Sequence, residues 1–208
     1  MDIERIVDSY QPPESGVNLV RDTEIAFLSG VSGVGKNSII SELLKKPYYM
    51  NIISHTTRAP RVNDGVMERD GENYYFIDIK TAKKMLEQGE FFEAKFVHGN
   101  IYGTSLKEIQ KIHDINKIGI TDIDVKGTEV YKNVAPNINT IFILPPNEQE
   151  WRRRLLTRSN ITEEELKKRI ETSKFEIEFA KKHNYFDFVI NDDLQTAVEE
   201  VDDLIRNK

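Results

Sequence analysis

The chain has 208 residues, of which 38% are hydrophobic and 31% charged, and its formal net charge is −6. This composition predicts one globular domain with small inserted lobes, and the negative charge argues against broad binding to nucleic acids or anionic membranes. The absence of cysteine excludes disulfides and thiolate metal sites. Because the sequence shows neither a signal-peptide pattern nor an apolar run of the roughly 18 residues that span a bilayer, it predicts a cytoplasmic protein.

Residues 1–22 are predicted to form an N-terminal extension that precedes the main domain at 23–208. The segment contains Pro12-Pro13 among turn-forming residues, which ends any early helix. We expect this extension to pack on the surface or to stay partly disordered, and the sequence assigns it no chemistry.

A strand, a glycine-rich loop and a helix are predicted in succession. Residues 25–28 form a short apolar run, and residues 39–44 have the apolar spacing of a helix. Between them, glycines let the backbone wrap a polyphosphate with its N–H groups, while Lys36 and the helix N-terminus add positive charge. A glycine-rich turn with a surface lysine would show the same pattern. The candidate phosphate-binding residues are Gly30, Ser32, Gly33, Val34, Gly35, Lys36, Asn37 and Ser38.

The loop departs from the pattern G-x-x-x-x-G-K-[ST] at its last position. Asn37 stands where the pattern has a hydroxyl, and the hydroxyl comes one residue later, at Ser38. Ser38 is therefore a candidate ligand of Mg²⁺, directly or through water.

Two arginines three residues apart follow a predicted short strand at residues 51–54. Arg58 and Arg61 lie in a loop in which Pro60 disfavours a helix. Because each planar guanidinium matches two phosphate oxygens, this pair is suited to capture a phosphate monoester. A solvated basic loop is the alternative.

The next stretch predicts a small lobe inserted between parts of the main sheet. After a turn at Asp70-Gly71, the aromatic residues 74–77 favour a strand, residues 81–88 favour a helix and residues 91–97 favour another strand. Residues 98–105 have turn chemistry and include a tyrosine whose hydroxyl could reach a ligand.

Two carboxylates end the following strand. Residues 118–124 have the pattern of a buried strand, and Asp122 and Asp124 lie on the same side of it. Ligands of parallel α/β sheets bind beyond the carboxyl ends of the strands, so these groups are suited to hold Mg²⁺ or its waters near phosphate. The alternative is a strand end that enters solvent.

The rest of the chain alternates strands with helices, which predicts a mainly parallel sheet of the α/β class. We expect strands at 140–144 and 185–190 and a terminal helix at 194–205. The predicted helices at 148–158 and 162–182 are dense in Arg and Lys. Most of these charges are typical of solvated faces, and the hypothesis is that a few close over a phosphate chain as a lid.

Taken together, these motifs resemble the guanylate kinase family from about Ile25 onward. The matching motifs, in the order of the family, are GVSGVGK at 30–36, SHTTRAPR at 54–61, ERDGENYYF at 68–76, EA at 93–94 followed by GNIYGT at 99–104, and DID at 122–124. The resemblance implies a P-loop NTPase-type parallel sheet flanked by helices, with an inserted small α+β GMP-binding lobe and a helical lid. The implied boundaries are a core at 23–54, 105–145 and 183–208, the lobe at 55–104 and the lid at 146–182.

The resemblance also implies roles for individual residues. It implies that Arg58, Arg61, Tyr74 and Tyr102 bind the GMP phosphate with support from Glu68, and that Ser54, Glu93, Thr104 and Asp124 read the guanine. It further implies that Asp122 lies near Mg²⁺, that Asn191 contacts adenine, and that Lys36, Arg58, Arg154, Arg158 and Arg169 are the catalytic residues.

A carboxylate suits the reading of guanine. Glu93 can accept hydrogen bonds from guanine N1–H and N2–H₂ together, whereas adenine lacks that pair of donors. A carboxylate facing adenine would leave polar atoms unpaired, at about 1–3 kcal/mol for each buried group.

The activity implied is ATP + GMP ⇌ ADP + GDP in purine nucleotide metabolism, with Mg²⁺ as cofactor and dGMP as a further acceptor. The partners are then ATP and GMP, without nucleic acid or membrane, and the sequence leaves open a monomer or a homodimer. Two departures from the family are Asn37 and about four extra residues between Arg61 and Glu68, which suggest a longer surface turn. We expect both to adjust rates without abolishing activity.

Two alternatives stay open. The first is a non-catalytic guanylate-kinase-like module that binds peptides; such modules lack parts of the loop or the phosphate cations, whereas Lys36, Arg58 and Arg61 are present here. The second is a related kinase with another phosphorylated acceptor, against which the set of guanine-reading residues argues.

Overall fold

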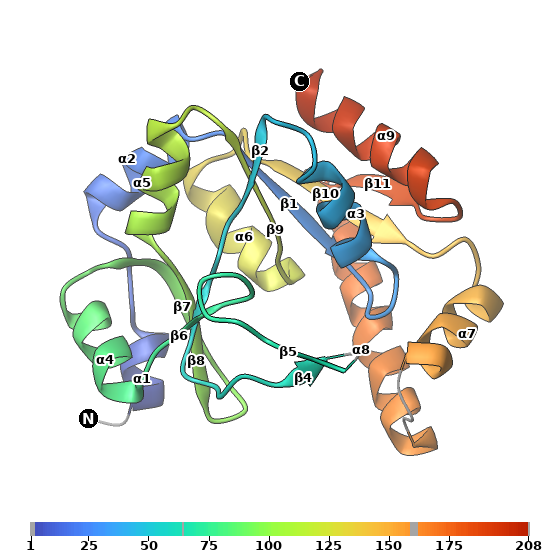
Figure 1. Cartoon of the computed structure of the whole chain (residues 1–208), viewed down its shortest axis with the longest axis horizontal. Helices are drawn as coiled ribbons and strands as arrows, with labels where there is room; N and C mark the ends of the chain where they lie inside the picture. Colours follow the sequence, from blue (N-terminus) through green and yellow to red (C-terminus); the bar gives the residue numbers. More distant parts are fainter. Residues whose placement is uncertain (1–2, 64, 159–161, 208) are drawn as a thin grey trace. The chain divides into compact units, whose positions relative to one another are not determined.

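The computed structural model describes residues 3–63, 65–158 and 162–207, which form two compact units (Figure 1). The first unit takes residues 3–24 and 50–119, and the second takes residues 25–49 and the described residues from 120 onward. The domain boundaries expected from the sequence stay a prediction.

The second unit is built on a parallel sheet. Its strands are β1 Ile25–Gly30, β2 Tyr49–Asn51, β9 Ile118–Asp122, β10 Asn139–Leu144 and β11 Asp187–Ile190, in the order β11-β10-β1-β9-β2. β10 pairs in parallel with both β1 and β11, and the boundaries between the two units fall within β2 and β9. This sheet confirms the predicted α/β class.

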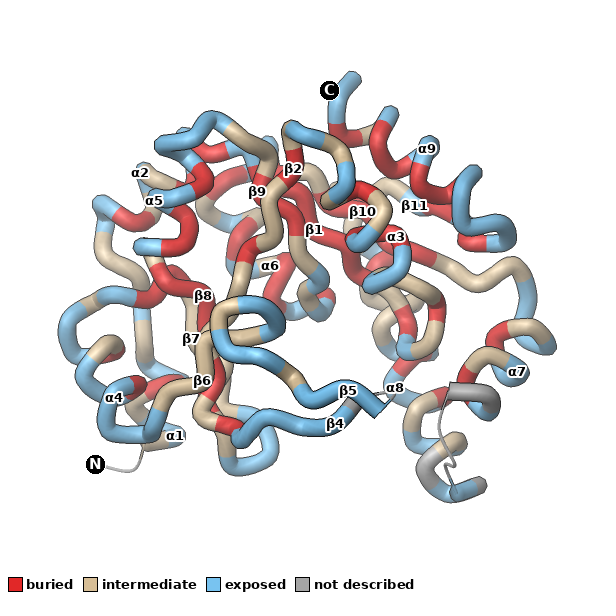
Figure 2. The backbone as a smooth tube through the Cα atoms, viewed as in Figure 1, coloured by how far each residue is buried: buried red, intermediate tan, exposed pale blue. Residues whose placement is uncertain are grey.

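Helices flank this sheet. They are α3 Lys36–Leu43, α6 Val125–Val134, α7 Glu148–Arg158, α8 Glu163–Lys182 and α9 Leu194–Arg206. α3 packs against α9, α6 packs against α8, and β1 contacts α3, α6 and α8. Figure 2 shows β1 buried along most of its length, as expected for a strand covered on both faces. None of the described helices combines the length and the apolar character needed to cross a bilayer.

The first unit contains a mixed sheet. Its strands are β3 His55–Thr56, β6 Tyr75–Phe76, β7 Phe91–Val97 and β8 Asn100–Ser105, in the order β6-β3-β8-β7. β8 is antiparallel to β7 and to β3, whereas β3 and β6 are parallel. The helices α4 Ile79–Glu87 and α5 Leu106–Asp114 belong to the same unit.

Two helices form where the sequence predicted only an extension. α1 Ile3–Asp8 packs against β7 and α4, and α2 Glu14–Asp22 packs against α5. With six and nine residues they are too short to be stable alone, so packing holds them and local pattern does not reveal them. Pro12 and Pro13 separate the two helices, which agrees with the predicted break.

The longer turn between Arg61 and Glu68 is a small hairpin. β4 Val62–Asn63 pairs antiparallel with β5 Val66–Met67 as a separate sheet. Val62, Val66 and Met67 are 59%, 63% and 54% exposed, so this segment lies on the surface as expected.

The prediction of a turn at residues 98–105 was wrong for most of that segment, which forms β8. The turn is confined to His98 and Gly99, both with positive φ. Pairing with two neighbouring strands overrides the low strand propensity of Gly103, and a Cβ there would lie 2.6 Å from the Glu93 carbonyl oxygen. The sequence also failed to predict α5 and α6, and it placed the second strand at 51–54 instead of 49–51.

Gly30, the last residue of β1, is pressed against the neighbouring strand. Its φ is +141°, and a Cβ on it would lie 2.4 Å from the carbonyl oxygen of Ile143 in β10. The main chain of β10 cannot move aside as a side chain could. Only glycine therefore lets the loop begin at this point of the sheet.

We expect Gly30→Ala to lower the free energy of unfolding more than Gly99→Ala does. Gly99 also has positive φ, at +78°, but a Cβ there meets nothing within 4 Å. Both variants suffer the backbone strain of about 1–3 kcal/mol, and Gly30→Ala must in addition separate β1 from β10. Urea unfolding of the two variants beside the wild type measures the difference, and equal losses would contradict the close approach of the strands.

Candidate active site

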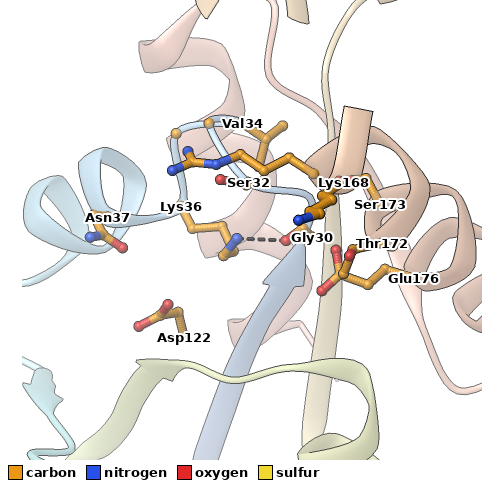
Figure 3. A pocket seen from close by; sticks show the side chains of 13 residues that line it. Gly30, Ser32, Val34, Lys36, Asn37, Asp122, Lys168, Thr172, Ser173 and Glu176 are labelled. Atoms are coloured by element: carbon orange, nitrogen blue, oxygen red, sulfur yellow. Dashed lines mark hydrogen bonds between the residues drawn. The ribbon is translucent and has the colours of Figure 1, made fainter. Parts of the chain in front are cut away.

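The glycine loop between β1 and α3 forms one wall of a pocket in the second unit. Gly35 is the N-cap of α3 in the left-handed conformation, and a Cβ on it would lie 2.4 Å from Asn191 Nδ2. The pocket has a volume of about 420 Å³, and residues of α8 form the opposite wall (Figure 3). Its lining residues are Gly30, Ser32, Gly33, Val34, Gly35, Lys36, Asn37, Asp122, Lys168, Arg169, Thr172, Ser173 and Glu176.

The pocket carries more positive than negative charge. Lys36 Nζ donates to the carbonyl oxygens of Gly30 at 2.5 Å and Val31 at 3.2 Å, so the ammonium lies directly over the loop (Figure 3). Lys168 and Arg169 add two cations from α8, against the carboxyl groups of Asp122 and Glu176. Burial raises the pKa of Glu176, nearby Asp124 raises it further, and Lys36 opposes the shift. The site therefore suits a polyanion.

The predicted phosphate-binding residues meet at this pocket, with one exception. Ser38 lies exposed on the first turn of α3 and does not line the pocket, whereas Asn37 does. The role of Ser38 toward Mg²⁺ stays a prediction.

The donor set fits a Mg²⁺ ion that arrives with a nucleotide. Among the residues that the structure describes, no three His, Asp or Glu side chains cluster as a metal site. Asp122, the last residue of β9, is one of the two carboxylates that line the pocket, and the Asn37 amide also lines it (Figure 3). Mg²⁺ in phosphate-transfer sites takes one or two carboxylates and completes its shell with phosphate oxygens and water, which this pocket can accommodate.

Side chains from distant elements hold the carbonyl groups of the loop. Trp151 of α7 donates from Nε1 to the Ser32 carbonyl at 2.9 Å, and Asn191 donates from Nδ2 to the Val34 carbonyl at 2.7 Å. Both residues are 5% exposed. The contact of Trp151 was not predicted, since its only signal was that it is the one tryptophan of the chain. The predicted role of Asn191 toward adenine stays a prediction.

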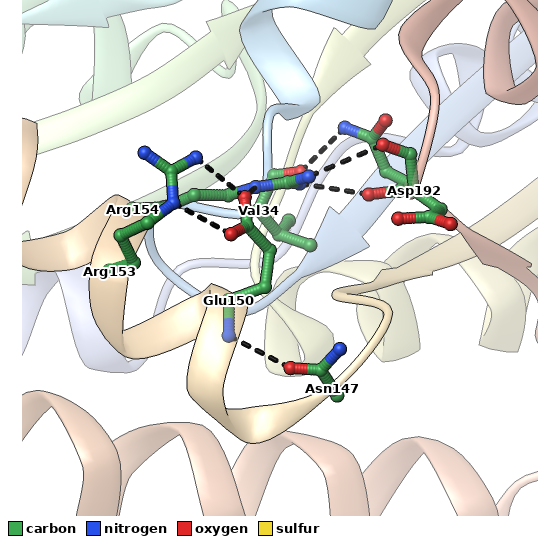
Figure 4. A network of polar contacts seen from close by, with 7 residues as sticks. Val34, Asn147, Glu150, Arg153, Arg154 and Asp192 are labelled. Carbon is green, nitrogen blue, oxygen red and sulfur yellow. Dashed lines mark hydrogen bonds and ion pairs between the residues drawn. The ribbon is translucent and has the colours of Figure 1, made fainter.

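The three predicted lid arginines differ in position. Arg154 donates to Glu150 Oε1 at 2.8 Å and to the carbonyl oxygens of Asn191 at 2.8 Å and Asp192 at 3.4 Å (Figure 4). These bonds hold it against the segment after β11, and it is not among the residues that line the pocket. Hydrogen bonds from Arg153 and Arg154 lower the pKa of Glu150 to about 2. Arg169 lines the pocket. The side chain of Arg158 lies outside the described residues.

Four further residues of α8 line the pocket without having been assigned to it. Lys168, Thr172, Ser173 and Glu176 join Arg169 there. The spacing from Arg169 was the available signal for three of them, since positions three, four and seven residues later share one face of a helix.

A second group of predicted residues meets in the first unit around Arg58. Glu68 accepts from Arg58 through both carboxylate oxygens, at 2.8 and 3.0 Å, and the two side chains are 8% and 7% exposed. Arg58 also donates from Nε to the Tyr102 hydroxyl at 3.2 Å and from Nη1 to the Ala59 carbonyl at 2.7 Å. These bonds, with that of Glu68 first, raise the pKa of Arg58.

Arg58 is held rigidly with donor capacity left over. Of the five guanidinium N–H groups, one on Nη2 has no partner among the described residues. The centroid of the Tyr74 ring lies 5.4 Å from the guanidinium carbon of Arg58. Glu68 also accepts from the Arg61 backbone N–H at 2.8 Å, while the Arg61 side chain is exposed. Glu68 therefore holds the side chain of Arg58 and the main chain of Arg61. The role of both arginines toward GMP stays a prediction.

The predicted base-reading residues of this unit lie together on β7, on β8 and before β3. Glu93 Oε1 accepts from the Thr104 backbone N–H at 3.1 Å and from its hydroxyl at 3.0 Å. The Thr104 hydroxyl also lies 3.5 Å from that of Ser54. Asp124 belongs to the second unit, where it is the N-cap of α6 and accepts from the Gly127 N–H at 2.7 Å. Its role toward guanine stays a prediction.

The sequence is similar to known guanylate kinases over most of its length. The family profile described as guanylate kinase matches residues 22–208. A guanylate kinase of Clostridioides difficile (strain 630) is 35% identical over 185 residues, which cover 88% of this chain and 87% of that protein. Guanylate kinase 1 of Oryza sativa subsp. japonica is 36% identical over 181 residues; the match covers 86% of this chain but only 46% of the rice protein, so the chain spans about half the length of that relative.

The fold agrees with a solved structure. The crystal structure of guanylate kinase from Anaplasma phagocytophilum superimposes with a TM-score of 0.65, covering 89% of this chain and 86% of that one at 24% sequence identity. This match identifies the P-loop NTPase fold. The family profile covers far more than half of the sequence, and the bacterial relative is matched over nearly its whole length. The chain therefore belongs to the guanylate kinase family.

Proposed function

We propose that the protein is a guanylate kinase, which transfers the γ-phosphoryl group of ATP to GMP and yields ADP and GDP. The observation that carries this proposal is the fixed guanidinium of Arg58, which Glu68, Tyr102 and Ala59 hold and which keeps one N–H without a partner in the described part of the chain. A guanidinium in this state is preorganised for a phosphate monoester, because its side-chain entropy is already lost before the ligand arrives.

ATP binds with its phosphates in the pocket of the second unit. The loop backbone and the N-terminus of α3 face the phosphates, and Lys36 leaves its two carbonyl partners to contact them. Arg169 and Lys168 approach from α8. Asp122 would hold the Mg²⁺ ion at this pocket, and the ion would supply positive charge to the phosphates.

GMP binds to the first unit. Arg58 and Arg61 bind its phosphate, and Tyr74 and Tyr102 complete that site. Glu93 accepts from guanine N1–H and N2–H₂, with its carboxylate oriented by Thr104. Each of these side chains lies on or beside the mixed sheet, so base and phosphate are held by one element.

Phosphoryl transfer requires little covalent help from the protein. The phosphate of GMP is a sufficient nucleophile without a general base, so catalysis consists of aligning two anions and neutralising the charge that the transferred group shares over its oxygens. Lys36 and Arg169 supply that charge on the donor, and Arg58 positions the acceptor. The predicted cytoplasmic location and the choice between monomer and homodimer stay predictions.

We expect ADP release in a coupled assay with ATP and Mg²⁺ only when GMP or dGMP is the acceptor. AMP, UMP and CMP are the other acceptors offered. Lys36→Ala and Arg58→Ala should each lower kcat/KM by at least about 100-fold, since each removes a charged hydrogen-bond donor from a phosphate. Lys45→Ala and Arg69→Ala are the matched controls, because both side chains are about 70% exposed, and they should leave the rate unchanged.

The outcomes of this assay separate the alternatives. Turnover with a phosphorylated acceptor other than a guanine nucleotide would identify a related kinase. No turnover with any nucleotide, in protein shown by circular dichroism to be folded, would overturn the enzyme and leave the peptide-binding module.

We also expect Glu93→Gln to raise the KM for GMP with little change in the KM for ATP. The amide presents one oxygen and one NH₂ group, so a donor faces guanine N2–H₂ where an acceptor stood. An unpaired buried donor costs about 1–3 kcal/mol, or about 5- to 150-fold in affinity. Glu90→Gln, which changes an exposed carboxylate three residues away, is the control, and an equal effect of both variants would count against a base-reading role.

A further inference from the structure

α1 lies against the strand that carries Glu93. Val7 of α1 is 4% exposed and packs in one cluster with Phe91 of β7 and with Leu86 of α4, while Ile3, Ile6 and Tyr10 pack at its edge. Burial of this apolar face fixes where α1 lies on the sheet. These residues precede the segment 22–208 that matches the family profile.

Tyr10, two residues after α1, makes a polar contact with β7. Its hydroxyl donates to the Phe91 carbonyl oxygen at 2.5 Å, across 81 residues of sequence. Burial raises the pKa of Tyr10, and nearby Glu90 raises it further, so the hydroxyl keeps its proton and acts as a donor. The contact joins the segment before the catalytic domain to the main chain of β7.

The bonded carbonyl lies at an irregularity of β7. Phe91 pairs with Ser105 and Glu93 pairs with Thr104, so two steps along β7 correspond to one step along β8. The extra residue, Phe92, makes this a β-bulge, and both Phe91 and Phe92 are fully buried. A bulge locally disrupts the ladder and turns the side chains that follow it. The direction of Glu93 therefore depends on the backbone conformation at Phe91.

Glu93 is the first residue after this bulge. Its Oε1 accepts from two donors of Thr104, which holds the end of the side chain on the β8 side. On the β7 side, the backbone direction at Glu93 is set by the bulge, where Tyr10 donates to the carbonyl oxygen of Phe91.

We infer that Tyr10 is a positioning residue for guanine recognition, which fixes the β7 bulge and thereby the direction of the Glu93 carboxylate. This inference rests on the proposed function, in which Glu93 reads guanine. Tyr10 touches neither substrate and acts through the Phe91 carbonyl. The N-terminal helices thus contribute to specificity as well as to folding.

The inference predicts an effect on selectivity that loss of stability alone would not produce. IMP has the N1–H of GMP but lacks its 2-amino group, so a correctly aimed carboxylate gains one more hydrogen bond from GMP than from IMP. If the backbone moves at the bulge, the Glu93 carboxylate turns, and its hydrogen bond with the 2-amino group of GMP becomes weaker. The ratio of the two affinities therefore reports the direction of Glu93.

The test compares Tyr10→Phe with Ser9→Ala by calorimetric titration of GMP and IMP and by thermal melting. Phe keeps the ring that packs at the edge of the cluster and removes only the hydroxyl. Ser9→Ala removes a neighbouring hydroxyl that donates to the carbonyls of Arg5 and Ile6 and has no bond to β7. Titration of ADP with Mg²⁺ on each protein is the control for the other substrate, and every titration is made well below the melting temperature of the variant.

We expect Tyr10→Phe to weaken GMP binding about 3- to 10-fold, because the hydrogen bond from the 2-amino group to the Glu93 carboxylate is partly lost. The ratio of GMP affinity to IMP affinity should narrow, and the affinities for IMP and ADP should stay nearly unchanged. Ser9→Ala should leave all affinities unchanged. A lower melting temperature for Tyr10→Phe with an unchanged ratio would reduce Tyr10 to a structural residue and overturn the inference. If the wild type itself bound neither GMP nor IMP, the proposed function would fail instead, so the two failures are distinguishable.

Discussion

The approach of Gly30 to β10 determines where the phosphate loop begins. The strand β1 ends against the main chain of Ile143, and the absence of a side chain at Gly30 lets the backbone leave the sheet at once. The position of Gly30 therefore sets where the following residues of the loop lie. The donors of Trp151 and Asn191 then hold two loop carbonyls, and Lys36 donates to those of Gly30 and Val31.

The site of the first unit depends on a buried ion pair. Removing either Arg58 or Glu68 would leave an uncompensated charge in a place that is almost closed to water, a change that typically costs about 3–5 kcal/mol. Because Glu68 also binds the Arg61 backbone, one carboxylate sets the position of both arginines.

Local chemistry was readable from the sequence, and distant contacts were not. The loop at residues 30–36 carries its signal in adjacent glycines and a lysine, and Arg58 and Arg61 suggest a phosphate by their spacing. The bonded pair of Arg58 and Glu68 came only from the family resemblance, since ten residues of loop separate the two. Trp151 and its partner Ser32 are 119 residues apart. No periodicity indicates such a contact, and α1 is too short to show an amphipathic pattern.

The missed contacts share one physical cause. Ser32, Val34 and Phe91 lie where the backbone is irregular, in a loop or at a bulge, and a side chain from a distant element donates to the carbonyl group of each. A buried carbonyl must find a donor, and here side chains from remote elements provide it. A single side-chain donor of this kind restricts the conformation of a backbone segment that would otherwise have several conformations. The backbone at these carbonyls is thus held by Trp151, Asn191 and Tyr10, which lie outside the motifs that the sequence shares with the family.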